Sequence, residues 1–279
     1  MNSKKNVIII GSNNSVNALD LVNKFENKNI KSILLSKSEF DDIIDLINFK
    51  KVYCVVNTSY YEEPTDLTKY ISENKLFNNP KYMYIVQNKL LTYNTLKDYV
   101  KQPKTSDEPF TYPCIGKYTK GSFGKQVELI KNEKQAKLFT KLYNGEVLFQ
   151  DYVKTSFGRH ARACVIGGKP MIFYNIVNND NYNNFKSNMA SGRAHVEELE
   201  ITDNLCDICN KIYEKIPLDN MGIDFLFGEN DELLLCEING NPYTNGPISL
   251  GVDIYGQYVD YIIDCIEKGE KRSNEKLCA

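Results

Sequence analysis

The residues best suited to chemistry lie in one predicted hairpin. Asp224 falls within an apolar run, Ile223–Phe227, and Glu237 and Asn239 end a second run that starts at Leu233. The intervening Gly-Glu-Asn-Asp-Glu predicts a turn. Residues two apart on a strand face the same side, so Glu237 and Asn239 should point together, and Asp224 can join them from the other strand. Two carboxylates and an amide oxygen form a hard oxygen site, which suits Mg²⁺ rather than zinc.

An alternative is that Glu237 and Asn239 are only polar residues at a strand end. However, Glu237 directly follows Leu-Leu-Leu-Cys. A carboxylate at the end of so apolar a run is costly unless something pairs with it, which favours the metal site. Asn241, Pro242 and Gly246 then break the strand into a loop.

A second chemical feature is the segment 112–130, which reads strand, loop, strand. Lys117 ends the first strand, and the loop Thr119–Gly124 carries two glycines and a serine. Glycines let a backbone bend over a phosphate, whose oxygens exposed N–H groups can then bind. The Walker pattern G-x-x-x-x-G-K-[ST] is absent. A Gly-Ser hairpin loop without a ligand explains the same residues, so both interpretations stay open here.

Basic residues gather at the start of another predicted hairpin, formed by 161–166 and 169–177 around Gly167-Gly168. Arg162 shares a face with Cys164 and Ile166, which predicts an inward guanidinium that needs an anion. The neighbouring His160 is interpreted as a surface residue without a role. The polar stretch 178–195 follows, and a loop of this length in a compact domain is usually functional or disordered. It contains Lys186, Asn188 and Arg193.

The elements that must position these residues include a predicted α/β region near the amino terminus. Short apolar runs at Val7–Ile10, Ile33–Leu35 and Val52–Val56 read as strands, and 16–25 reads as a helix. Strands that alternate with helices predict a parallel sheet. The turn Gly-Ser-Asn-Asn-Ser lacks the G-x-G-x-x-G spacing of dinucleotide-binding folds. It is interpreted as an ordinary strand-to-helix turn; the alternative is that it lines a substrate pocket at the sheet's carboxyl edge.

Further elements are predicted along the rest of the chain. They are a helix over 90–100, a strand over 146–153, an amphipathic helix over 202–216 and a helix over 254–267. Cys206 and Cys209 lie one turn apart on the apolar side of the predicted helix 202–216, and no second pair of cysteines has matching spacing. Helix core is therefore favoured over a zinc or redox role.

Composition bounds the class of protein. The chain has 279 residues, with 34 basic and 36 acidic side chains, so nothing indicates a nucleic-acid partner. The amino terminus is polar and the run 7–10 is too short for a signal peptide or a membrane span. We therefore expect a cytoplasmic protein with no membrane partner, and the eight cysteines, mostly within apolar runs, are consistent with that.

Taken in order, these motifs resemble a known family. Lys89 is followed by Lys117 with its Gly-Ser loop, by Phe-Gln-Asp-Tyr-Val, by Arg162 ahead of Gly-Gly-Lys, by Phe-Lys-Ser-Asn, and by Gly-Ile-Asp and Glu-Ile-Asn. The set, from about residue 87 to 265, is similar to the ATP-grasp superfamily, in its RimK-like branch of carboxylate–amine ligases. The resemblance implies an α/β (α+β) protein, with an ATP-grasp fold of two α+β subdomains after a small parallel-sheet α/β domain. The implied domains are 1–86, 87–153 and 154–271, with a tail at 272–279.

The resemblance also implies roles for individual residues. Asp224, Glu237 and Asn239 would hold Mg²⁺, and Arg162 would face the γ-phosphate and acyl phosphate, with Lys117 and Asn188 also catalytic. Lys186 and Arg193 would contact substrate. Lys186 stands where the family has arginine, and it offers a point charge rather than a planar guanidinium that can bind an anion with two hydrogen bonds. The implied nucleotide ligands are two lysines, a flexible loop and the adenine-reading segment: Lys89, Lys117, Gly121, Ser122, Phe123, Gly124, Gln150, Asp151, Tyr152 and Val153.

The implied activity is ATP-dependent formation of an amide through an acyl phosphate, with release of ADP and phosphate. ATP and Mg²⁺ are the expected cofactors, with two ions rather than one and Mn²⁺ as a substitute. The partners would be a carboxylate and an amine, as amino acid, peptide, protein or carrier-bound group, and family members are often homo-oligomers. Two alternatives stay open: a ligase that joins free small molecules, and a nucleotide-binding module without catalysis.

Overall fold

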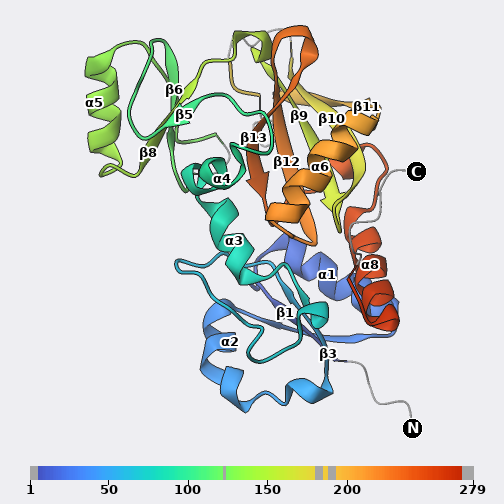
Figure 1. Cartoon of the computed structure of the whole chain (residues 1–279). Coiled ribbons are helices and arrows are strands. Elements are labelled where there is room, and N and C mark those ends of the chain that lie inside the picture. The colour runs from blue at the N-terminus through green and yellow to red at the C-terminus, as the bar shows by residue number, and fades with distance from the viewer. Residues whose placement is uncertain (1–5, 122–123, 180–184, 188–192, 272–279) are drawn as a thin grey trace.

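The computed structural model describes residues 6–121, 124–179, 185–187 and 193–271. Three sheets organise them (Figure 1). The first is parallel, in the order β2-β1-β3-β4, and confirms the parallel arrangement that the amino-terminal sequence predicts. Its strands and the helices that follow them are β1 Asn6–Ile10, α1 Val16–Asn27, β2 Lys31–Leu35, α2 Lys37–Ile43, β3 Val52–Asn57 and β4 Leu76–Phe77.

Strand β1 is a short apolar run that is buried on both of its faces. Val7 and Ile9 pack against α1 and the carboxyl-terminal helix, while Ile8 and Ile10 pack on the opposite face around Phe40. A strand buried on both faces needs apolar residues at every position, not at alternate ones.

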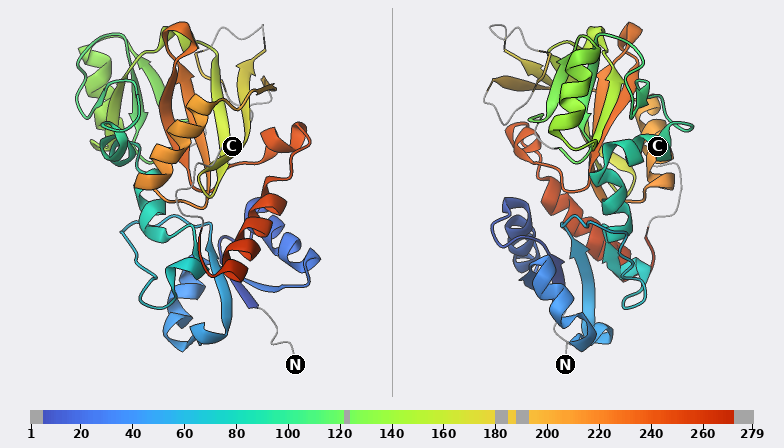
Figure 2. Two further views of the ribbon diagram at one scale, coloured as in Figure 1. Left: turned by 45° about the vertical axis from the view of Figure 1, so that its right-hand side comes forward. Right: turned by 90° about the vertical axis from the view of Figure 1, so that its left-hand side faces the viewer.

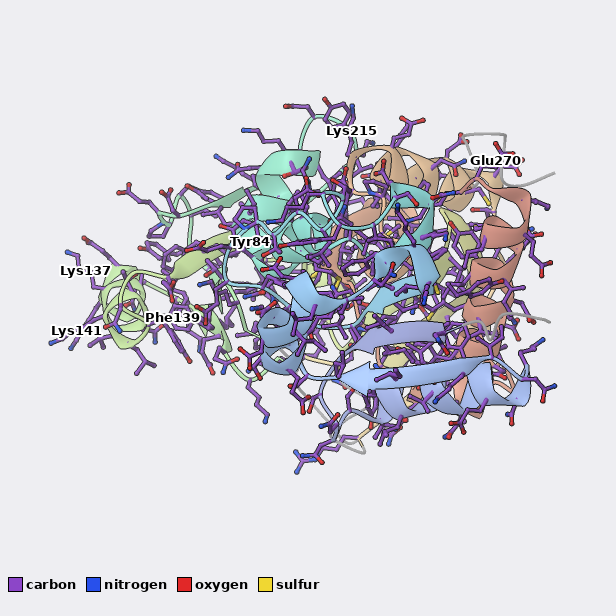
Figure 3. The ribbon with its side chains drawn as sticks, turned by 90° about the horizontal axis from the view of Figure 1, so that it is seen from below. Tyr84, Lys137, Phe139, Lys141, Lys215 and Glu270 are labelled. Carbon is purple, nitrogen blue, oxygen red and sulfur yellow. The ribbon has the colours of Figure 1, made fainter. Side chains whose placement is uncertain are left out.

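The second sheet is antiparallel, in the order β5-β8-β6-β7. Helix α5 covers one face, where Ala136 and Phe139 meet Ile130 and Phe149. The elements of this half and of the link before it are α3 Pro80–Gln87, α4 Lys89–Leu96, β5 Thr105–Ser106, β6 Cys114–Tyr118, β7 Val127–Ile130, α5 Glu133–Leu142 and β8 Val147–Asp151. Seen from below, Phe139 of α5 and Glu270, just past the last helix, lie at opposite ends of the molecule (Figure 3).

The third sheet is also antiparallel, in the order β11-β10-β9-β12-β13. Helix α6 packs on one face, with Leu205, Cys209 and Ile212 against apolar side chains of β9 and β12. The elements here are β9 Arg159–Ile166, β10 Lys169–Asn178, β11 Ala194–Leu199, α6 Asp203–Lys215, β12 Asn220–Phe227, β13 Leu233–Asn239, α7 Asn245–Ser249 and α8 Ile254–Lys268. Both Cys206 and Cys209 are buried on α6.

Helix α8 ties the third sheet to the first. Tyr258 and Ile262 share one core with Val7 and Phe25 on one side and with Cys164 and other β9 residues on the other. Figure 2 shows α8 beside α1 from two further directions. The mixed α/β architecture confirms the predicted fold class. No helix among the described residues is long and apolar enough to cross a membrane.

Several elements differ from the sequence prediction. The helix expected over 90–100 ends at Leu96, and the sequence did not predict α3, α5 or β11. Strand β11 lies at an edge of its sheet and pairs only with β10 among the described strands, so its residues carry little of the apolar pattern that predicts a strand.

Candidate active site

Strand register assembles the predicted site as a row across the third sheet. Tyr174 on β10 lies opposite Arg162 on β9, Arg162 opposite Asp224 on β12, and Asp224 opposite Glu237 on β13. Directly opposed residues have Cβ atoms only about 5 Å apart, so residues remote in sequence become neighbours. Because α6 covers the other face of the sheet, this row faces away from it, toward the second sheet.

Arg162 and Asp224 form a close ion pair. The guanidinium Nε lies 2.6 Å from Asp224 Oδ1 and Nη2 lies 2.7 Å from Oδ2. Burial alone raises the pKa of the Asp224 carboxyl, but Arg162 more than reverses this, so the pKa lies below its usual value. Burial alone lowers the pKa of Arg162, and the Asp224 carboxylate outweighs it, so that pKa is raised. Both groups are therefore charged at neutral pH.

A β-bulge places Glu237 in the row. Asp224 pairs with Glu237 but the next residue, Phe225, pairs with Leu235, so Cys236 is the extra residue. Without the bulge, Leu235 and Glu237 would face the same side. With it, Leu235 packs in the core beneath α6, while Glu237 lines the cleft between the sheets.

The remaining predicted metal ligand also joins this cluster. Asn239 Nδ2 lies 3.4 Å from Asp224 Oδ2. Rotation of the amide group by 180° would present its oxygen to the site instead. Asp224, Glu237 and Asn239 then offer two carboxylates and one amide oxygen on one side of a hairpin, a donor set that fits Mg²⁺.

Two lysines approach the row from the other half of the molecule. Lys89 Nζ lies 3.2 Å from Glu237 Oε1 and also donates to the carbonyl of Gly121. Lys117 is the penultimate residue of β6, is only 7% exposed, and has Nζ 3.4 Å from Cys236 Sγ. Lys89 therefore contacts a predicted metal ligand, and Lys117 contacts Cys236, the residue directly before that ligand.

The glycine-rich loop follows Lys117. Gly124 has φ +64°, and a Cβ there would meet nothing within 4 Å, so the backbone at this position borders open space. At Gly121 a Cβ would lie 2.9 Å from Gln126 Oε1. The other two predicted loop residues, Ser122 and Phe123, lie outside the described residues.

The predicted adenine-reading segment, 150–153, comprises the last two residues of β8 and the two that follow. Gln150 is buried and donates from Nε2 to Thr105 Oγ1 at 3.1 Å. Asp151 ends β8, and its N–H donates to the carbonyl of Lys104 at 2.9 Å. Tyr152 and Val153 follow, and all four residues line the cleft.

The cleft has a volume of about 730 Å³ and is lined by side chains of the second and third sheets and their connections. The predicted substrate residues Lys186 and Arg193 line it, whereas Asn188 lies outside the described residues. Asn17 and Tyr60 reach it from the amino-terminal region. None of the turn residues 11–15 lines the cleft, and Ser15 caps α1, so the interpretation as an ordinary strand-to-helix turn is favoured.

His160 corrects one interpretation of the sequence. It is not a surface residue without contacts, because it lines the cleft and its Nδ1 lies 2.5 Å from Ser187 Oγ. Burial lowers the pKa of His160 to about 4; Asp224 opposes this shift, and Arg162 and Lys117 add to it. Its position two residues before Arg162 on the same strand places both on one face, which the sequence could have indicated.

Comparison with known proteins agrees with this geometry. A family model of the RimK-like ATP-grasp domain matches residues 69–262. The chain belongs to this family. The family resemblance inferred from the ordered motifs is thus confirmed.

Relatives and solved structures extend the comparison. An uncharacterized protein, MG012 of Mycoplasma genitalium, is 31% identical over 143 residues, which cover 51% of this chain and 47% of the relative. The chain thus spans about half the length of that relative. Coenzyme gamma-F420-2:alpha-L-glutamate ligase of Methanococcus maripaludis is 28% identical over 283 residues, covering 97% of this chain and 92% of the relative. The ATP-grasp ligase PsnB, complexed with a minimal precursor, matches 95% of this chain and 99% of its own with TM-score 0.72 at 16% identity, which shows a shared fold.

Proposed function

We propose that the protein is an ATP-dependent carboxylate–amine ligase that forms an amide through an acyl phosphate and releases ADP and phosphate. The observation that carries this proposal is the convergence of Lys89 and Lys117 from one half of the cleft on the row of Arg162, Asp224 and Glu237 from the other. A carboxylate is a poor electrophile, and phosphorylation gives it a good leaving group. The protein must then stabilise a charged phosphoryl group, which this arrangement can do.

Two cations of the site are each paired with one of its carboxylates. Arg162 holds Asp224, and Lys89 holds Glu237. We propose that binding exchanges these partners: the phosphates take Lys89, Lys117 and Arg162, and Asp224, Glu237 and Asn239 hold Mg²⁺. Magnesium would neutralise phosphate charge when bound, and the residues fit one or two ions.

The chain's own residues account for the rest of the chemistry. A carboxylate oxygen of the substrate attacks the γ-phosphorus and ADP departs, while Arg162 stabilises the charge that develops on the transferred group. The amine then attacks the carbonyl carbon, phosphate departs, and the nitrogen loses a proton. A loop closing at Gly121–Gly124 would keep water from the acyl phosphate. Gln150–Val153 would bind the adenine.

We place the substrates in the part of the cleft bordered by Lys186 and Arg193. A relative named as a glutamate ligase, and a structure of the ATP-grasp ligase PsnB complexed with a precursor peptide, support our proposal of an amino acid, peptide, protein or carrier-bound substrate. A ligase that joins two free small molecules is the alternative. We also propose the division into domains 1–86, 87–153 and 154–271, with a tail at 272–279.

A screen tests the proposal. Purified protein with Mg-ATP is offered amino acids and peptides in pairs, and ADP release is followed. We expect one carboxylate to stimulate release, and hydroxylamine to trap it as a hydroxamate when the amine is omitted. ATP binding without turnover, across carboxylates of every class, would instead support a nucleotide-binding module.

A further inference from the structure

One short segment bridges the two halves of the cleft. Phe185 places its ring edge-on to Tyr152, with 6.3 Å between ring centroids. Lys186 Nζ lies 3.7 Å from Glu128 Oε1 on β7. These contacts join Phe185–Ser187 to the half that carries the predicted adenine and phosphate residues.

Hydrogen bonds also attach the same segment to the third sheet. Asn178, the last residue of β10, donates from Nδ2 to the carbonyl of Lys186 at 2.7 Å. His160 on the neighbouring strand β9 has Nδ1 2.5 Å from Ser187 Oγ. The segment is thus bonded at two successive residues by side chains from two adjacent strands.

His160 is placed to couple this segment to the row of charged residues. It lies two positions before Arg162 on the same strand face, opposite Ile176 of β10. The charged groups that face it are Asp224 on β12, Arg162 on β9 and Lys117 on β6. Because burial holds its pKa near 4, the imidazole is uncharged at neutral pH and adds no third cation beside Arg162 and Lys117.

We propose that His160 is a positioning residue: through its hydrogen bond to Ser187 it holds Phe185–Ser187 across the cleft, so that Lys186 stays beside the bound carboxylate substrate. The substrate part of this proposal rests on the proposed ligase function. The positioning part does not, because the contacts exist in the protein alone.

The chain has only two histidines, so the imidazole signals of His160 can be assigned with a single further variant. Nitrogen-15 spectra of the imidazoles, with His195→Asn to assign His160, report the hydrogen bond directly. Digestion with trypsin and mass spectrometry reports how fast the chain is cut after Lys186, which requires local opening of the segment. His160→Ala, His160→Asn, Ser187→Ala and the double Ala variant are compared. Mg-ADP binding serves as the control for an intact fold.

We expect Ser187→Ala to shift the Nδ1 resonance of His160. We also expect both Ala variants to be cut after Lys186 about five- to tenfold faster, as the loss of one hydrogen bond allows. The double variant should be cut no faster than either single, because both remove the same bond. His160→Asn keeps a polar atom near the position of Nδ1 and should restore slow cleavage, and His195→Asn should leave it unchanged.

An unchanged His160 spectrum in Ser187→Ala, or cleavage rates that multiply in the double variant, would overturn the proposal. If His160→Ala fails to bind Mg-ADP, Ser187→Ala, which removes a single oxygen, keeps the comparison decisive. Failure of every carboxylate to stimulate ADP release would refute the ligase function alone, since neither readout here uses a carboxylate.

Discussion

Asp224→Asn separates the structural from the chemical role of the ion pair in the row. The substitution keeps the size of the side chain and removes its charge, so Arg162 remains buried without an anion. Breaking a buried pair by removing one partner costs about 3–5 kcal/mol. The two side chains retain 17% and 11% exposure to the cleft, which lets some water reach them, so we expect a loss near the lower end, about 3 kcal/mol. That corresponds to a fall in Tm of roughly 6–12 °C.

The assay is thermal unfolding of the variant beside a matched control, Glu237→Gln. The ion pair of Glu237 with Lys89 is longer, at 3.2 Å, and the Glu237 side chain is 25% exposed. Lys89 is only 9% exposed, but it keeps its hydrogen bond to the Gly121 carbonyl and the glutamine amide oxygen can still accept from it, so the substitution should cost only about 1 kcal/mol. Both variants should lose Mg²⁺-dependent nucleotide binding. A third variant, Arg162→Met with Asp224→Leu, should regain much of the stability, because no charge is left buried, yet not bind Mg-ADP.

Equal stability of Asp224→Asn and wild type would refute the ion pair as a buried structural element. Retained Mg²⁺-dependent binding in Glu237→Gln would refute the metal assignment independently, whatever the stability data show.

Other predictions follow from the same site. Lys117→Gln should weaken ADP binding by more than tenfold in calorimetry, because a cation that is only 7% exposed is removed from the phosphates; an unchanged affinity would contradict its assignment. Backbone amides at Gly121 and Gly124 should exchange more slowly when a non-hydrolysable ATP analogue is added, and unchanged exchange would count against a closing loop. Removal of Mg²⁺ with EDTA should lower ADP affinity at least tenfold, since carboxylates without the ion keep their lysine and arginine partners. His160 takes up its proton near pH 6.5 when unfolded but only near pH 4 when folded, so stability should fall by on the order of 2 kcal/mol between these values; His160→Asn should lack this loss, which urea unfolding at both pH values measures.

The sequence predicted the elements whose pattern is local and strong. Three of the four strands of the parallel sheet, the two hairpins and the helices predicted over 202–216 and 254–267 each carry a clear apolar period or turn. The candidate ligands Asp224 and Glu237 were found because they interrupt or end apolar runs, where a charged side chain is costly unless it is paired.

Other features depend on tertiary contacts and were not visible in the sequence. Nothing local to Cys236 indicates that it forms a bulge, although the bulge decides which way Glu237 points. The pairing of Arg162 with Asp224 follows from β9 lying beside β12, an order that short-range patterns do not specify. His160 was misread because its partner Ser187 lies 27 residues later in the chain, beyond the reach of a local pattern.

The most direct test of the proposed chemistry follows one oxygen atom. The carboxylate selected by the screen is labelled with ¹⁸O, turned over with ATP and its amine, and the products are examined by ³¹P NMR. An acyl phosphate transfers one labelled oxygen to inorganic phosphate and leaves ADP unlabelled, which is the result we predict. Label in AMP, with release of pyrophosphate, would place the reaction at the α-phosphate and contradict the roles assigned to Arg162, Lys117 and the Asp224–Glu237 pair.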